Sequence, residues 1–325
     1  MTVDQITYLT FGLILVFALV FDLGLLSKKN TKISTRKALY QTLFWVFLSI
    51  AFCLFLWFEK GPIVATKYFT AYLMEWSLSV DNIFVFILIF TYFKVEENDT
   101  ARALLIGIML AVVFRIVFIA VGIGIIERFH WVIYILGAFL VYTGYKLFFK
   151  KDEAEFDPGN SRIYRFMKKW LRLSEVEPHG RYFVDHHGKT FVTTLAVVVV
   201  MLAAVDIAFA LDSIPTVVSL VRDNARIPFT ADDKLVIYSS NIFAILGLRS
   251  LFFLLRNAVH KFDFLQQGIA IVLVFIGVKM LLEIFHIRIS IFISLAVIVV
   301  CLVASVLYSQ HHQRQQAIKK ALSES

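Results

Sequence analysis

Two short stretches of an otherwise apolar chain carry acidic and polar residues at matching positions. The first is EWSLSVDNI, residues 75–83, and the second is DIAFALDSI, residues 206–214. Each has an acid, a second acid six residues later, and then an amide or hydroxyl residue. The six are Glu75, Asp81, Asn82, Asp206, Asp212 and Ser213. Their oxygens are hard donors, of the kind that bind Mn²⁺, Mg²⁺ or Ca²⁺, and together they indicate a site for a divalent cation.

These four carboxylates need compensation if they lie inside a lipid bilayer. A charged side chain at the bilayer centre costs about 2.5–3.5 kcal/mol on insertion scales. Arg115 and Arg249 can neutralise two of the four acids, and one divalent cation would neutralise the other two. Ion pairs that only hold helices together are the alternative. Lys146 and Lys279 lie nearer the ends of their segments, where we expect them to snorkel to the interface.

Helix geometry limits how these acids can meet. Glu75 and Asp81 differ by about 120° around a straight helix, so they do not share one face. Convergence on one ion therefore requires a partner helix or a break in the helix. Pro215 cannot donate to the carbonyl of Leu211, which indicates a break beside Asp212.

The composition identifies the elements that must carry these residues. Of 325 residues, 59% are hydrophobic and 17% are charged, against about 25% charged in soluble domains. Apolar segments of about 20 residues, enough for a helix to cross a bilayer, recur along the chain. Nine are predicted: 6–27, 38–58, 69–93, 101–126, 131–149, 191–221, 235–255, 264–285 and 288–309. The predicted fold is all-α, a single polytopic membrane domain over residues 1–325.

The order of polar residues predicts an internal repeat. Asp81, Arg115 and Lys146 are separated by 34 and 31 residues, and Asp212, Arg249 and Lys279 by 37 and 30. FLVYTGYKL at 139–147 likewise matches VLVFIGVKM at 272–280. We therefore predict two copies, 69–149 and 191–285, with helices 1, 2 and 9 peripheral. Three spans per copy make the repeat inverted, an arrangement typical of transporters with a site near the midplane.

The distribution of charge predicts an orientation. The net charge is +8, but most Lys and Arg residues lie in alternate loops, above all in the loop 150–190, and this excludes a nucleic-acid partner. The positive-inside rule predicts an outside N-terminus and a cytoplasmic C-terminus. In that loop, RIYRFMKKWLRL predicts an amphipathic helix on an anionic membrane surface or on the protein itself. RYFVDHHGKTFVTT predicts two short strands around a turn near Gly188.

Two further groups of residues lie within the predicted spans. Ser239 and Asn241, in the stretch YSSNIF, line an ion pathway or hold packed helices together. The two cysteines, Cys53 and Cys301, lie inside predicted spans and are interpreted as apolar filling.

At these residues the chain resembles the TerC family, and within it the Alx-like branch of bacterial manganese exporters. The resemblance covers nearly the whole chain and is carried by EWSLSVDNIFVF, FALDSIP, SSNIFAILGLRSLFFLL and LVFIGVKML. It implies a LysE-like fold and a multi-pass inner-membrane protein that exports Mn²⁺ through the six oxygen ligands. One position departs: relatives have a further Glu where this chain has Ala203, which puts ion selectivity or proton coupling in doubt.

Three functions are compatible with these features of the sequence. The first is efflux of a divalent cation, most simply Mn²⁺, by a protein that is no enzyme and holds no resident cofactor. The second is a membrane scaffold that helps exported proteins assemble or acquire metal, with other membrane proteins as partners. The third, an intramembrane aspartyl protease, is disfavoured because neither Asp81 nor Asp212 follows the glycine pattern expected of that class.

Overall fold

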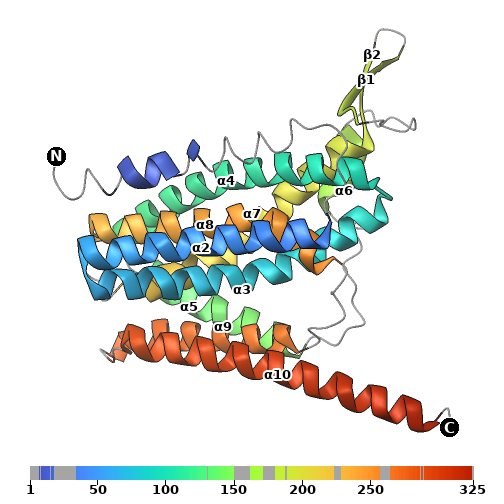
Figure 1. Cartoon of the computed structure of the whole chain (residues 1–325). Helices are drawn as coiled ribbons and strands as arrows, with labels where there is room; N and C mark the ends of the chain where they lie inside the picture. The colour runs from blue at the N-terminus through green and yellow to red at the C-terminus, as the bar shows by residue number, and fades with distance from the viewer. Residues whose placement is uncertain are drawn as a thin grey trace.

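The structure of the chain, a computed structural model, consists of long helices packed side by side with a small hairpin at one end (Figure 1). It describes residues 7, 9–14, 16–17, 34–129, 131–149, 162–170, 180–186, 189–222, 228–256, 264–285, 287 and 289–323. The elements are α2 (Thr35–Lys60), α3 (Pro62–Tyr92), α4 (Glu97–Arg128), α5 (Val132–Phe148), α6 (Arg162–Trp170), β1 (Phe183–His186), β2 (Lys189–Val192), α7 (Thr194–Val221), α8 (Ala231–Leu255), α9 (Leu265–Leu282), η3 (Glu283–Phe285) and α10 (Ile291–Ser323).

The described helices fit an all-α polytopic membrane protein. Six of them are long and apolar enough to cross a membrane, namely α2, α3, α4, α7, α8 and α10. The apolar helices α5 and α9 are shorter. These eight helices fall on the predicted segments 2 to 9. Of the predicted segment 6–27, the described residues are helical at 9–14, and most of the remainder lies outside the described part of the chain.

The bundle has two ends that the contacts define. At one end, which we call the Gly61 end, α2 passes into α3 through Gly61, and Lys67 of α3 contacts Asp233 at the start of α8. At the other, the hairpin end, α3 turns into α4 and the hairpin β1–β2 leads into α7. There the ring of Phe93 packs on Tyr164 of α6. The hairpin projects beyond the helices (Figure 1).

The central helices form two parallel pairs. A Cβ atom added at Gly107 of α4 would lie 3.1 Å from Leu202 of α7, and one at Gly122 would lie 3.6 Å from Ile214. Because both numbers rise together, α4 and α7 run parallel. In the same way α3 runs parallel to α8. Lys67 meets Asp233 near the start of both helices, and Phe90 meets Phe252 near their ends.

Helices α5 and α9 cross in antiparallel fashion at unusually short range. A Cβ atom at Gly144 would lie 2.7 Å from the carbonyl oxygen of Ala270, and one at Gly277 would lie 2.6 Å from that of Gly137. Real Cβ atoms do not approach backbone so closely, so only glycine fits at these two positions. Small residues that let backbones approach are a common device of membrane helix pairs.

Two expectations about helix geometry are wrong. Helix α7 runs without interruption through Pro215, so there is no break beside Asp212. Lys279 does not snorkel to an interface: it is 5% exposed, and its Nζ donates to the carbonyl of Ser219 at 3.0 Å. That carbonyl is in the last turn of α7 and has no amide partner within the helix, so the ammonium group caps the helix.

The elements of the polar loop are confirmed where the structure describes them. Helix α6 coincides with RIYRFMKKW, buries Met167 against the bundle and leaves Phe166 63% exposed. Strands β1 and β2 pair antiparallel, with Phe183 opposite Val192, and the turn around Gly188 lies outside the described residues. The helix thus packs on the protein through one face.

Candidate functional site

Arg115 joins four helices near the middle of the bundle. Its side chain is buried, and its Nη1 donates to Glu75 Oε2 of α3 at 2.5 Å and to Asn241 Oδ1 of α8 at 3.0 Å. Its Nη2 donates to Asp206 Oδ1 of α7 at 2.9 Å. A guanidinium suits this role, since its planar fork holds two carboxylates at once. The guanidinium group of Arg115 therefore binds one acid from each of the two matching stretches.

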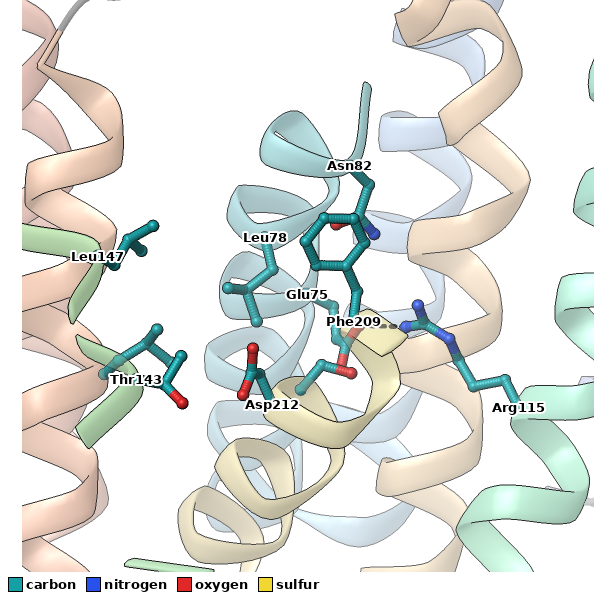
Figure 2. Close-up of a pocket in the computed structure, with 10 residues that line it drawn as sticks. Glu75, Leu78, Asn82, Arg115, Thr143, Leu147, Phe209 and Asp212 are labelled. Carbon is teal, nitrogen blue, oxygen red and sulfur yellow. Dashed lines mark hydrogen bonds and ion pairs between the residues drawn. The ribbon is translucent and has the colours of Figure 1, made fainter. Parts of the chain in front are cut away.

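A cavity lies beside this ion-pair network (Figure 2). Its walls come from five helices, α3, α4, α5, α7 and α9, and the lining residues are Glu75, Leu78, Asn82, Arg115, Thr143, Leu147, Phe209, Asp212, Ser213 and Leu273. Figure 2 shows Glu75 and Asp212 reaching toward the same space from α3 and α7, with Thr143 of α5 on the far side. Both matching stretches thus supply walls of one cavity.

Helical periodicity explains which residues of each stretch reach the cavity. Residues seven apart differ by about 20° around a helix, because seven residues make nearly two turns. Glu75 and Asn82 therefore share a face of α3, as Asp206 and Ser213 share a face of α7. Asp212, the neighbour of Ser213, also lines the cavity.

Four oxygen atoms around this cavity are buried without a hydrogen-bond partner of acceptable geometry. They are Glu75 Oε1, Asn82 Oδ1, Asp212 Oδ1 and Ser213 Oγ. A buried polar atom without a partner is costly, and such atoms are uncommon in folded proteins. Four such oxygen atoms border one small cavity, two from each stretch. They indicate that the cavity binds a ligand that oxygen atoms coordinate.

The donor set defines the kind of ligand. Two carboxylates, an amide and a hydroxyl are the oxygen ligands that Mn²⁺, Mg²⁺ and Ca²⁺ accept. Among the described residues, no group of three or more His, Cys, Asp and Glu side chains is placed to hold a metal ion. A cation here would therefore depend on Asn82 and Ser213 as much as on the two acids.

The remaining predicted site residues lie close by or outside the described part. Asp206 does not line the cavity but is bound to Arg115, which does. The side chain of Asp81, one of the two acids that the protease alternative requires, lies outside the described residues. Arg249 is 4% exposed on α8. Ser239 is also buried, but its hydroxyl donates to the carbonyl of Leu235 in its own helix at 2.6 Å.

Sequence reasoning missed Thr143, the polar contribution of α5. Thr143 lies beside Asp212 and interacts with its carboxylate. Thr143 is part of FLVYTGYKL, but the residue that aligns with it in VLVFIGVKM is the apolar Ile276. A comparison that selects polar residues shared by both stretches therefore does not select Thr143. Asn241 was predicted either to line an ion pathway or to hold packed helices together, and in the structure its Oδ1 accepts a hydrogen bond from Arg115.

Comparison with known proteins places the chain in a family. A sequence model of the integral membrane protein TerC family matches residues 59–317. The chain belongs to the TerC family. Among its relatives, an uncharacterized membrane protein of Rickettsia bellii is 35% identical over 303 residues, covering 93% of this chain and 96% of that protein. Another, from Myxococcus xanthus, is 36% identical over 297 residues, or 90% and 89% of the two chains.

One group of TerC relatives carries a name that suggests a function. A protein of Salmonella typhi named as a putative membrane-bound redox modulator, Alx, is 34% identical over 321 residues, covering 95% of this chain and 96% of that protein. No solved structure matches the chain. The resemblance drawn from the sequence motifs therefore agrees with the family at the level of the whole chain.

Proposed function

We propose that this TerC-family protein carries a divalent cation across the membrane through the cavity between α3, α5 and α7. The observation that carries the proposal is the set of four buried oxygens, from Glu75, Asn82, Asp212 and Ser213, that border this cavity without a hydrogen bond of acceptable geometry. A transporter that binds and releases an ion needs coordinating oxygen atoms that are not occupied by hydrogen bonds before the ion binds. The protein is on this view a transporter and no enzyme, with the cation as its cargo.

The charges around the cavity favour a divalent cation as the transported ion. The cavity and the residues bound to its walls include three carboxylates, Glu75, Asp206 and Asp212, and one guanidinium, Arg115. With all four ionised, their sum is two negative charges, which one divalent cation neutralises. Arg115 binds Glu75 through Oε2 and leaves Oε1 for the ion.

We infer that residues 69–149 and 191–285 are two inverted copies, and that the chain has nine membrane helices. The pairings support this relation. If α3 corresponds to α7 and α4 to α8, the symmetry operation that relates the two copies maps the parallel pair α3–α8 onto the parallel pair α4–α7. A shift of 133 residues also converts the close approach of Gly144 and Ala270 into that of Gly277 and Gly137. A twofold axis in the membrane plane produces both regularities.

Manganese as the cargo, and export as the direction, come from the family resemblance together with ligand chemistry. Oxygen-only coordination suits Mn²⁺ and does not favour zinc or copper, which prefer imidazole or thiolate. We further propose the bacterial inner membrane with a cytoplasmic hairpin end, since α6 and the hairpin, which belong to the basic segment 150–190, lie there.

Manganese accumulation in cells tests the proposal. Under manganese load, cells with Asp212→Asn or Glu75→Gln should hold severalfold more manganese than wild type, because each change removes a charged ligand. Asp185→Asn is the matched control, since Asp185 is an exposed acid of the hairpin and should change nothing. With purified protein, Thr143→Val should weaken Mn²⁺ binding about tenfold by calorimetry. Equal manganese in wild-type and Asp212→Asn cells would contradict export.

A scaffold for exported proteins is the second candidate, and the projecting hairpin favours it. Phe183 on β1 is 61% exposed at a place where a partner could bind. This candidate predicts that changes in the hairpin, and not in the cavity, cause the phenotype. The redox role in the names of the Alx relatives finds less support here: Cys53 and Cys301 are free and do not line the cavity.

A further inference from the structure

An uncharged residue, Asn241, binds Arg115 from α8. Asn241 is 0% exposed, and it is not among the residues that line the cavity. Its only printed contact with the site is the hydrogen bond from Arg115, which does line the cavity. An effect of Asn241 on a bound cation would therefore act through Arg115.

The amide group of Asn241 fits its surroundings in one orientation. Its Nδ2 donates to the carbonyl oxygen of Ile237, one turn earlier in α8, at 3.0 Å, and its Oδ1 accepts from Arg115 Nη1 at 3.0 Å. A guanidinium group can only donate and a backbone carbonyl can only accept, so the reversed amide would lose both hydrogen bonds. The backbone of α8 thus keeps Oδ1 directed at Nη1.

Asn241 and Glu75 share one nitrogen of the guanidinium group. Nη1 carries two N–H groups, and its two acceptors are Asn241 Oδ1 and Glu75 Oε2 (Figure 2 shows the bond to Glu75). Nη2 donates to Asp206 Oδ1 of α7. Acceptors on three helices therefore fix the guanidinium group. In this position Glu75 binds Arg115 through Oε2, and its Oε1 has no hydrogen bond of acceptable geometry.

A guanidinium group and a carboxylate often form two parallel hydrogen bonds with each other. In that arrangement Arg115 would occupy both oxygens of Glu75 and leave neither for a cation. Without the acceptor of Asn241, one buried N–H of Nη1 would lose its partner, which is costly. Because Oε1 belongs to the carboxylate already bound to Nη1, a rotation of the two groups would satisfy both atoms.

We propose that Asn241 is a positioning residue of the cation site, which keeps Glu75 Oε1 available to the ion by occupying one N–H of Arg115 Nη1. The proposal rests on the transport function and adds a residue that sets the affinity without contacting the ion. Arg115 and the cation compete for the same carboxylate, and Asn241 favours the cation. The role also accounts for a buried amide on α8, a helix that supplies no wall of the cavity.

Binding of Mn²⁺ to the purified full-length protein in detergent tests this role. By calorimetry, Asn241→Leu should weaken Mn²⁺ binding about tenfold, since groups that orient a metal ligand contribute about 10- to 100-fold to affinity. Asn241→Ala, with the same expected result, takes its place if the leucine variant is not expressed. Asn241→Asp keeps an acceptor for Nη1, so its affinity should not fall.

Ser240→Ala is the matched control. Ser240 is the neighbour of Asn241 on α8, is also 0% exposed, and its hydroxyl donates to the same carbonyl of Ile237, at 3.3 Å. Its loss changes the packing of α8 without touching Arg115, so Mn²⁺ affinity should stay at the wild-type value.

Two further backgrounds separate positioning from a general loss of structure. In Glu75→Gln the oxygen that Asn241 protects no longer belongs to a carboxylate, so adding Asn241→Leu should weaken Mn²⁺ binding by less than about twofold. In Thr143→Val, a change beside Asp212, adding Asn241→Leu should still weaken binding about tenfold, because independent changes add. A structural defect would lower the affinity equally in both backgrounds.

Thermal unfolding in the presence of a chelator gives a second readout that needs no ion. If Arg115 takes both oxygens of Glu75 in Asn241→Leu, then Glu75→Gln breaks a two-bond ion pair there and a one-bond ion pair in the otherwise unchanged chain. The drop in unfolding temperature caused by Glu75→Gln should therefore be larger in the Asn241→Leu background. An equal drop in the two backgrounds would overturn the role of Asn241.

The binding results distinguish this proposal from the transport function. Unchanged Mn²⁺ affinity in Asn241→Leu, or an equal loss in the Glu75→Gln and Thr143→Val backgrounds, would overturn the positioning role. If Asp212→Asn raises cellular manganese while Asn241→Leu binds Mn²⁺ like the wild type, export stands and the role of Asn241 is excluded. If the wild-type protein binds no Mn²⁺ but the unfolding temperatures behave as expected, Asn241 still controls Arg115 and the manganese site fails.

Discussion

Arg115 is the residue on which the centre of the molecule depends. It contacts Glu75 and Asp206, one acid from each half, and it also contacts Asn241. Both carboxylates are almost fully buried, so without the guanidinium they would be two uncompensated charges. A lysine could not replace it, because an ammonium group lacks the fork that holds two carboxylates in fixed positions.

Removing this guanidinium should destabilise the protein strongly. Breaking a buried ion pair by deleting one partner costs about 3–5 kcal/mol, so Arg115→Met should lower the free energy of unfolding by an amount of this order. Thermal unfolding of the purified protein in detergent measures it. Arg128→Gln, an exposed arginine of the same helix, is the control and should change little. Equal unfolding temperatures for the two variants would contradict the role of Arg115.

A double substitution measures the contact between Arg115 and Glu75. Glu75→Gln removes one of the two charges that Arg115 compensates, so part of the stability lost in Arg115→Met should return when both changes are combined. Residues in contact are not additive, and the interaction free energy is expected at about 0.5–3 kcal/mol.

The helices themselves were predictable, whereas their relative positions were only partly so. Length and apolarity located the eight helices from α2 to α10 that carry the bundle, and the matched stretches identified Glu75 and Asp212 as facing one site. Thr143 was missed because its helix carries no acid and its counterpart is apolar. The burial of Lys279 was also missed, since its partner is a backbone carbonyl at a helix end, which no sequence pattern records.

The crossing of α5 and α9 predicts a sharp difference between two glycines. Gly277→Ala adds a Cβ atom about 2.6 Å from the carbonyl oxygen of Gly137, so the helices must separate, at a cost of about 1–3 kcal/mol. In α4, a Cβ atom at Gly124 meets nothing within 4 Å. Gly124→Ala should therefore leave the unfolding temperature in detergent unchanged or raise it, because alanine favours the helix. A similar loss for both variants would contradict the close crossing.

On the proposed inverted repeat, α5 and α9 are equivalent helices of the whole molecule. Their surroundings differ, since Leu147 borders the cavity, whereas Met280 is 1% exposed and lies beside Gly137 of α5. Ion pairs join α2, α3 and α8 at the Gly61 end. The repeat is therefore proposed from topology and sequence spacing, and it does not require identical side-chain packing in the two halves.

The charge distribution predicts the orientation of the whole molecule in the membrane. Helix α6 and the hairpin belong to the Lys- and Arg-rich segment 150–190 of the sequence and lie at the hairpin end, so the positive-inside rule predicts that this end is cytoplasmic. In a chain without Cys53 and Cys301, Asp185→Cys should react with an impermeant maleimide only in inverted vesicles. Glu59→Cys should react only in intact cells, because Glu59 is exposed beside Gly61.

Both reporters should react fully once the membrane is permeabilised, which controls for a buried or unreactive thiol. The expected pattern places the hairpin end, and with it the start of α7, in the cytoplasm. Labelling of Asp185→Cys in intact cells would contradict the positive-inside prediction and place that end outside.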